Sequence, residues 1–283
     1  MLENKKIVIT GASQGIGFVV AKKCIAEGAD VIIISRNEKE LRQAADDLSL
    51  VSGRKQQYYQ LDVGDLGKVQ QFASWLREKK ITFEGLVNCA GVYGSIGKTT
   101  EVDLAEFTKT IQINLLGTVY MCSCVGRLMQ SEKRKKIVNY SGGGAATPFP
   151  YYSAYASSKA AVVRFTENLA LELRNDGIDV NCIAPGFVVT RLHQQTLTAG
   201  MTTAGASFYE MTKKQIKNGG IPPEKAADLS CFLLSELSDG ITGKFISAPW
   251  DPWQTEEFQK QMRDDKDAAT LRRIDQKTFF KKS

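Results

Sequence analysis

The chain has 283 residues, of which 43% are apolar and 24% carry a charge, a composition typical of an ordinary globular protein. It contains no run of about 18 apolar residues, as a membrane-spanning helix requires, and no apolar signal segment precedes its first strand-like run. We therefore expect a cytoplasmic protein that does not enter the membrane. The net charge of +6 is spread along the chain, without the basic stripe and interleaved aromatic residues that nucleic-acid binding would require.

The distribution of cysteine and histidine disfavours a metal site. Six cysteines are scattered without a CxxC pair, and His193 is the only histidine. We expect the cysteines to be buried thiols and no metal to be bound. The basic cluster EKRKK at 132–136 precedes a strand-like run, and we expect it to be a solvated loop.

Short runs of β-branched residues recur along the chain and predict seven strands. They lie at residues 7–10, 31–35, 58–63, 86–90, 136–141, 179–186 and 244–248. Segments with helical apolar spacing fill the intervals between them. The alternation predicts a Rossmann-type, doubly wound α/β fold, in which a mostly parallel seven-stranded sheet is flanked by helices on both faces. Because no segment has the composition of a linker, we expect residues 1–283 to form a single domain.

A glycine-rich segment, GASQGIG at 11–17, separates the first predicted strand from the first predicted helix. Gly11 would permit a sharp exit from the strand, and Gly15 and Gly17 would let the backbone approach a pyrophosphate. The free N–H groups of the following helix would point at that anion. Three glycines alone are a weak signal, but their place in the first βα unit favours a dinucleotide-binding turn over a purely structural one.

The second predicted strand ends in Ser35-Arg36-Asn37. A site that prefers NAD usually has a carboxylate here, which binds the adenosine ribose and would repel a 2′-phosphate. This chain has no acid at that place, and Arg36 offers a charged donor to a phosphate. We expect NADP(H) to be preferred and NAD(H) to be bound less well, the alternative being that Arg36 is simply a surface residue.

Two tyrosines have a lysine four residues later, Tyr155 with Lys159 and Tyr209 with Lys213. On a helix, this spacing puts both side chains on one face. Tyr155 opens a long predicted helix just after the fifth predicted strand. An open α/β sheet places its ligand at the carboxyl ends of its strands, so Tyr155 and Lys159 are the better candidates for a catalytic pair.

In its order of motifs, the chain resembles the short-chain dehydrogenase/reductase family over roughly residues 5–248. The matching elements are TGASQGIG at 10–17, LDV at 61–63, NCAG at 88–91, Asn114, Ser141, Tyr155 with Lys159, and PGFVVT at 185–190. The GxxxGxG spacing resembles the reductase subgroup and not the branch of sugar epimerases and dehydratases, which carries TGxxGxxG.

The resemblance implies an active site of Asn114, Ser141, Tyr155 and Lys159. Tyr155 would act as the general acid in reduction and as the base in oxidation, with its phenolate favoured by Lys159. Lys159 would also hold the nicotinamide ribose. Ser141 would hydrogen-bond the substrate carbonyl, and Asn114 would fix a water that relays protons to Lys159.

The resemblance also implies a set of cofactor-binding residues. These are Gly11, Ser13, Gln14, Gly15, Ile16, Gly17, Ser35, Arg36, Asp62, Val63, Asn88, Ala90, Gly91, Lys159, Pro185, Gly186, Val188 and Thr190. Asp62 should meet the adenine, Asn88 the sheet framework and the ribose region, and Thr190 the nicotinamide amide.

One position departs from the family pattern. The family serine usually lies thirteen residues before the tyrosine, where this chain has Gly142, and Ser141 lies one residue earlier. The segment between them is rich in glycine and proline, so a loop longer by one residue would restore the register. Thr147 and Ser153 are the alternative candidates for the role of the catalytic serine. The remaining possibility is a weakened enzyme that lacks this hydroxyl.

Residues 191–221 follow the PGFVVT motif, where the family carries a substrate-covering lid, and their small and polar residues fit a mobile lid. His193 could contact substrate from this lid, but an exposed or locally hydrogen-bonded histidine is the preferred interpretation. Phe149, Tyr151 and Tyr152 could either line the pocket or pack beneath the loop.

Residues 249–283 form a C-terminal extension that we expect to contain a docked helix. Trp250 and Trp253 suit either a subunit interface or a cap over a neighbouring pocket. The sheet edge beside this extension often pairs with a second subunit in the family, so a homodimer or homotetramer is expected.

Together these features predict an NADP(H)-dependent carbonyl reductase or alcohol dehydrogenase acting on a small molecule. The SGGG loop and the WDPW ending faintly resemble reductases of surface-sugar pathways, which favours a sugar or nucleotide-sugar substrate. A small ketone, a ketoacyl thioester or a hydroxylated ring stays open as the substrate. Two alternatives stay open: a catalytically weak, dinucleotide-binding regulatory protein, and a non-redox sugar epimerase or dehydratase with bound cofactor.

Overall fold

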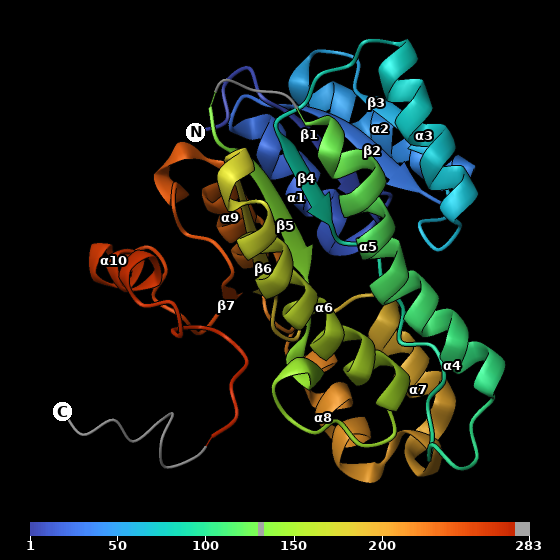
Figure 1. Cartoon of the computed structure of the whole chain (residues 1–283). Helices are drawn as coiled ribbons and strands as arrows, with labels where there is room; N and C mark the ends of the chain where they lie inside the picture. Colours follow the sequence, from blue (N-terminus) through green and yellow to red (C-terminus); the bar gives the residue numbers. More distant parts are fainter. Residues whose placement is uncertain (130–132, 275–283) are drawn as a thin grey trace.

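A seven-stranded parallel sheet forms the centre of the molecule in the computed structural model, which describes residues 1–129 and 133–274 (Figure 1). The strands run in the order β3-β2-β1-β4-β5-β6-β7. They are β1 (Lys6–Thr10), β2 (Asp30–Ser35), β3 (Gln57–Gln60), β4 (Gly85–Asn88), β5 (Lys135–Tyr140), β6 (Ile178–Ala184) and β7 (Phe245–Ser247). All adjacent strands are parallel, which confirms the predicted Rossmann-type fold.

Helices cover both faces of the sheet. Their bounds are α1 (Gly15–Ala26), α2 (Glu38–Ser52), α3 (Leu66–Glu78), α4 (Leu104–Ile111), α5 (Gly117–Tyr120), α6 (Ser153–Glu172), α7 (Arg191–Ala204), α8 (Ala206–Lys217), α9 (Pro223–Leu234) and α10 (Glu256–Asp264). Alternate residues of β1 explain the two layers: Ile7 and Ile9 pack with α1, α2 and α9, whereas Val8 packs with α3 and the helix that contains α5. Both faces of the strand are therefore apolar.

The fourth and fifth helices belong to one continuous helical segment that contains two π-helical turns, at Gln112–Leu116 and Met121–Val125. Asn114 lies in the first of these turns. Single π-turns within a helix occur often at functional sites, because they shift the direction of a side chain relative to the regular helix. None of the helices in the described ranges is long and apolar enough to cross a membrane.

The C-terminal extension covers the outer edge of the sheet. The backbone N–H of Phe245 in β7 donates to the carbonyl of Ala269 at 2.7 Å, and buried Lys244 donates to the carbonyls of Asp265 and Ala268. Farther along, the N–H of Leu271 donates to Glu167 of α6 at 2.8 Å. The extension contains one helix, α10, and the segment 265–274 comes after it.

The two tryptophans of the extension have different environments. Trp253 is buried and packs on Phe232 of α9, with ring centroids 5.5 Å apart, while Trp250 is 77% exposed. Trp253 therefore holds the extension on the domain, and Trp250 is the one that is open to a partner.

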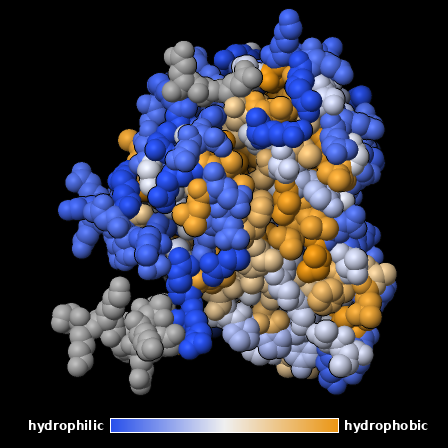
Figure 2. Space-filling view, in the orientation of Figure 1, coloured by the Kyte–Doolittle hydropathy of each residue, from blue (hydrophilic) through white to orange (hydrophobic). Residues whose placement is uncertain are grey.

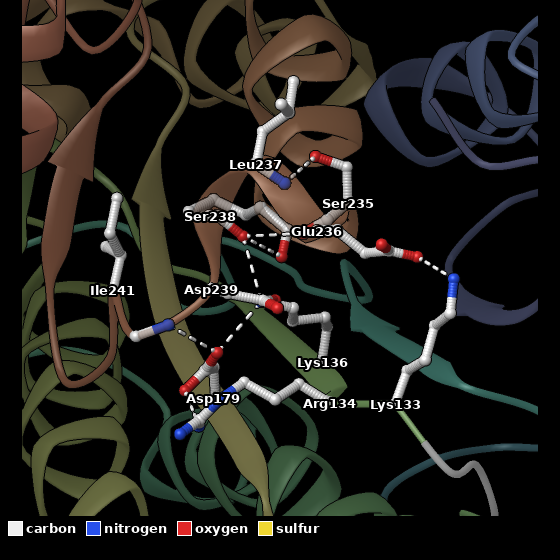
Figure 3. Close-up of polar contacts among 12 residues, drawn as sticks. Lys133, Arg134, Lys136, Asp179, Ser235, Glu236, Leu237, Ser238, Asp239 and Ile241 are labelled. Atoms are coloured by element: carbon white, nitrogen blue, oxygen red, sulfur yellow. Dashed lines mark hydrogen bonds and ion pairs between the residues drawn. The ribbon is translucent and has the colours of Figure 1, made fainter.

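A buried ion cluster lies at the amino ends of β5 and β6, away from the carboxyl ends where ligands bind (Figure 3). Lys136 Nζ lies 2.9 Å from Asp179 Oδ2 and 2.7 Å from Asp239 Oδ1, and Arg134 Nη1 lies 2.9 Å from Asp179 Oδ1. Lys136 and Asp179 are almost fully buried. The interpretation of the basic cluster at 132–136 as a solvated loop is thus wrong for Lys136, whose charge is balanced inside the sheet.

Candidate active site

The turn between β1 and α1 is shaped by glycines, which are required there by their backbone angles or by close packing. Gly11 and Gly15 adopt φ values of +68° and +58°, which favour glycine. A Cβ on Gly17 would lie 2.5 Å from the carbonyl oxygen of Gly11. No side chain caps the start of α1, so its first N–H groups remain available to an anion.

A cavity of about 500 Å³ begins at this turn and runs along the carboxyl ends of the strands to Tyr155. It is lined by most of the predicted cofactor residues, from Gly11 through Thr190. Its size and its uncapped helix start suit a dinucleotide. Three of the predicted residues, Asn88, Gly186 and Val188, do not line it.

Asn88, Gly186 and Val188 support the walls of the cavity. The amide nitrogen of Asn88 donates to Asn139 Oδ1 at 2.9 Å, which ties β4 to β5. Gly186 has φ +78°, and a Cβ there would lie 2.5 Å from Ile221. Val188 is buried.

Other lining residues were absent from the sequence-based prediction. They are Ile34, Leu61, Cys89, Val92, Ile113, Tyr140, Val189, Arg191, Leu192 and Gln195. Most are apolar neighbours of a predicted residue, and three of them stand inside the quoted motifs LDV, NCAG and PGFVVT, namely Leu61, Cys89 and Val189. Arg191, at the start of α7, also forms an ion pair of 2.8 Å with Glu40 of α2.

The end of the cavity near β2 carries hydroxyl groups and one cation. Ser13 Oγ and Ser35 Oγ lie 2.9 Å apart, and Arg36 beside them is half exposed. Arg36 Nη1 is 3.8 Å from Asp62 Oδ2, an exposed and weak pairing. Asp62 also accepts a hydrogen bond from the N–H of Gly64 at 2.9 Å.

Tyr155 and Lys159 lie on the first turns of α6, at the other end of the cavity. Lys159 is buried, and its ammonium donates to the carbonyl of Tyr140 at 2.8 Å. Burial raises the pKa of Tyr155, with a smaller contribution from Cys89, and burial lowers the pKa of Lys159. The phenol is therefore protonated at neutral pH in the protein alone.

The second pair, Tyr209 and Lys213, has the same distance between lysine and ring. In both pairs the lysine Nζ lies 5.8 Å from the centroid of the tyrosine ring. Lys213 is 54% exposed and Tyr209 lies on α8, and neither lines the cavity. The position in the fold, and not the spacing, distinguishes the two pairs.

Asn114 is fully buried beside the loop after β4. Its Oδ1 accepts the N–H of Val92 at 2.8 Å, and its Nδ2 donates to the carbonyl of Val92 at 2.9 Å and to Ser158 at 3.0 Å. A Cβ on Gly91 would lie 3.3 Å from both Asn114 Oδ1 and Lys159 Nζ. Asn114, Gly91 and Lys159 thus meet at one point.

Ser141 lines the cavity with Tyr155 and Lys159, but its hydroxyl is already engaged within the protein. Its hydroxyl donates to the backbone carbonyl of Lys159 at 2.9 Å. Gly142, which has extended backbone angles, faces the Tyr155 hydroxyl. Because side chains alternate along an extended chain, it is position 142, and not the side chain of Ser141, that faces the Tyr155 hydroxyl.

The two alternative hydroxyls are also engaged elsewhere. Thr147 donates to the carbonyl of Gly143 at 3.0 Å, and Ser153 accepts from Thr99 at 2.8 Å. Neither residue lines the cavity.

An aromatic cluster packs under the segment 191–217, which forms helices α7 and α8 in place of a loop. Tyr152 is fully buried, stacks on Phe149 at 4.4 Å and donates to Thr196 at 2.8 Å. These contacts favour packing over pocket lining for Phe149 and Tyr152.

His193 belongs to the same buried region. Its ring lies 3.9 Å from that of Phe187, and its Nδ1 accepts from the N–H of Thr190 at 3.4 Å. Burial lowers its pKa to about 4, so it is neutral at physiological pH. This local hydrogen bond agrees with the preferred interpretation of His193.

The fold, the glycine turn and the Tyr155–Lys159 pair agree with what comparison with known proteins shows: the chain belongs to the short-chain dehydrogenase family. The family model for short chain dehydrogenase matches residues 5–200. The chain is 32% identical to a 3-oxoacyl-[acyl-carrier-protein] reductase of Chlamydia muridarum over 254 residues, which cover 87% of this chain and 96% of that protein.

Two further relatives widen the range of chemistry. A glucose 1-dehydrogenase of Gluconobacter oxydans is 30% identical over 245 residues, covering 86% of this chain and 89% of that protein. A short chain dehydrogenase of Shigella flexneri, solved in complex with NADP, matches with a TM-score of 0.76 and 27% identity, covering 87% of this chain and 98% of that one. The chain is therefore an oxidoreductase of a family that uses NAD or NADP.

Proposed function

We propose that this protein is an NADP(H)-dependent carbonyl reductase, or the reverse alcohol dehydrogenase, with Tyr155 as its acid–base group. The observation that carries the proposal is a single cavity that joins the uncapped start of α1 to Tyr155 and Lys159. A nicotinamide cofactor bound there would supply or accept the hydride. The glycine turn fits such a cofactor, because Gly11 and Gly17 let the turn pack closely on itself and on the loop after β4, and the uncapped start of α1 leaves N–H groups for a pyrophosphate.

In reduction, Tyr155 would donate its proton to the substrate oxygen. The apolar surroundings that raise its pKa keep the phenol protonated until a substrate arrives. Lys159 has three donors, of which one is fixed on Tyr140, so the others can hold ribose hydroxyls. Asn114 would keep the loop at Gly91 and Val92 beside Lys159.

The proposed substrate is a small carbonyl compound or secondary alcohol, including the sugar and nucleotide-sugar classes. Helices α7 and α8 would form its lid, because they cover the aromatic cluster beside Tyr155 and contain a kink at Gly200. The experiment that tests the function is a screen of carbonyl compounds for NADPH oxidation, followed as loss of nicotinamide absorbance. Turnover of a sugar without any change in absorbance would instead support an epimerase or dehydratase.

The preference for NADP(H) rests on the group formed by Ser13, Ser35 and Arg36. We expect Arg36→Gln to weaken NADPH binding about 10-fold or more while NADH binding changes little, because only NADPH carries the 2′-phosphate that a guanidinium would hold. Fluorescence titration with both cofactors measures this effect. Arg42→Gln is the matched control, since Arg42 lies on α2 outside the cavity and pairs with Glu38. An equal loss for both cofactors would contradict the assignment of Arg36.

We also propose that the protein forms a homodimer or homotetramer. Figure 2 shows apolar side chains gathered over the face that α4, α5 and α6 present. The exposed apolar residues of these helices and of the π-helical turn before α5 include Leu104, Leu116 and Leu171. An apolar face of this kind is suited to association between copies.

A further inference from the structure

The short segment that leaves β5 touches helix α6 at three successive residues. The carbonyl of Tyr140 accepts from Lys159 Nζ at 2.8 Å. Ser141 Oγ donates to the carbonyl of Lys159 at 2.9 Å. Gly142 lies directly against the hydroxyl of Tyr155. Three consecutive residues thus contact the ammonium of Lys159, the backbone carbonyl of Lys159 and the hydroxyl of Tyr155.

Gly142 is not required by the backbone at this point. Its φ of −172° and ψ of 175° are extended and open to any residue. What excludes a side chain is Tyr155: a Cβ on Gly142 would overlap the Tyr155 hydroxyl and lie 3.1 Å from Cζ. The absence of a side chain at 142 therefore determines how close the phenol can come to the strand.

The hydroxyl of Ser141 is likewise engaged by α6. It is buried, and its proton is donated to Lys159. Any role for it at a substrate oxygen would require this hydrogen bond to break. Gly142, the residue that faces the phenol, has no side chain and therefore offers no side-chain donor to a substrate.

We infer that Gly142 and Ser141 are positioning residues that set the places of Tyr155 and Lys159, and that Tyr155 alone among these side chains donates to the substrate oxygen. This inference rests on the proposed function for its catalytic part only. The contact between Gly142 and the Tyr155 hydroxyl can be tested without a substrate.

The first test is a double-mutant cycle in thermal unfolding. Gly142→Ala should lower the melting temperature by about 3–10 °C, as overpacking by one methyl does. In a Tyr155→Phe background the same change should cost less than half as much, because the overlapping hydroxyl is gone. Gly143→Ala is the matched control, since a Cβ there meets nothing within 4 Å. Equal losses from Gly142→Ala in both backgrounds would overturn the inference.

The second test uses turnover, with the carbonyl compound that the wild type reduces best. Gly142→Ala should lower kcat by about 10-fold to 100-fold through displacement of Tyr155, with the Kd for NADPH unchanged. Gly143→Ala should keep wild-type kcat. Ser141→Ala should alter the pH dependence of kcat through Lys159, whereas Ser141→Thr, which keeps the hydroxyl, should restore it. If Gly142→Ala turns over like Gly143→Ala, positioning by Gly142 is refuted, and this result is distinct from a wild type that reduces nothing.

Discussion

Tyr155→Phe is expected to lower turnover by about 100-fold or more while NADPH binds as in the wild type. The change removes the phenolic proton of Tyr155 at the inner end of the cavity and keeps the ring that packs edge-on against Tyr93 at 4.8 Å. Steady-state kinetics with a reducible carbonyl compound, together with a fluorescence titration of NADPH, separates the two effects.

Tyr209→Phe provides a matched control, because Tyr209 has the same spacing and the same 5.8 Å contact with its lysine but lies outside the cavity. It should retain wild-type turnover. If Tyr155→Phe also retained it, Tyr155 could not be the acid.

The pH dependence of this group follows from its surroundings. Burial raises the pKa of Tyr155, so the phenol is an acid over the neutral range and must lose its proton before it can act as a base. Oxidation of an alcohol should therefore become faster as pH rises, and reduction of a carbonyl should persist at neutral pH and decline only at alkaline pH. Initial rates in both directions between pH 6 and pH 10 measure this, and an oxidation rate that falls with rising pH would contradict it.

Asp179→Leu is expected to produce the largest loss of stability, about 3–5 kcal/mol in the free energy of unfolding. Asp179 accepts from Lys136, Arg134 and the N–H of Gly240, so its removal leaves the buried ammonium of Lys136 without its buried partner and with only the exposed Asp239. Denaturation by urea measures the loss.

The double variant Lys136→Met/Asp179→Leu should recover much of that loss, because it leaves no buried charge in the cluster. Asp239→Asn should cost far less, since Asp239 is 44% exposed. Affinity for NADPH should be the same in all three variants, because the cluster lies at the opposite ends of the strands from the cavity. An unstable double variant would show that the cluster stabilises the fold beyond charge balance.

The sequence was most informative where local chemistry and periodicity agree. The runs of β-branched residues located all seven strands, and the glycine turn could be predicted because Gly11 and Gly17 are required by the turn itself. Ser141 shows where this approach stops. A shift of one residue reverses the direction of a side chain on an extended chain, and composition does not reveal which of two neighbours faces a helix distant in sequence.

The environments of Lys136 and Tyr152 could not be predicted from the sequence for a similar reason. A lysine in a basic run suggests solvent, and only the pairing of β5 with β6 brings Asp179 next to it. Tyr152 acquires its partners from α7 and α8, whose helical form the small and polar residues of 191–221 did not suggest. In both cases the deciding contacts join residues more than forty positions apart.

The contact between Phe245 and Ala269 has a consequence for chains that lack the segment 265–272. Without Ala269 and Leu271, β7 would display an unpaired N–H beside the apolar flank of α6. A chain cut before residue 265 would therefore carry an open template for strand addition, the surface from which intermolecular aggregation begins. Segment 265–272 thus protects the outer edge of the sheet from pairing with another molecule.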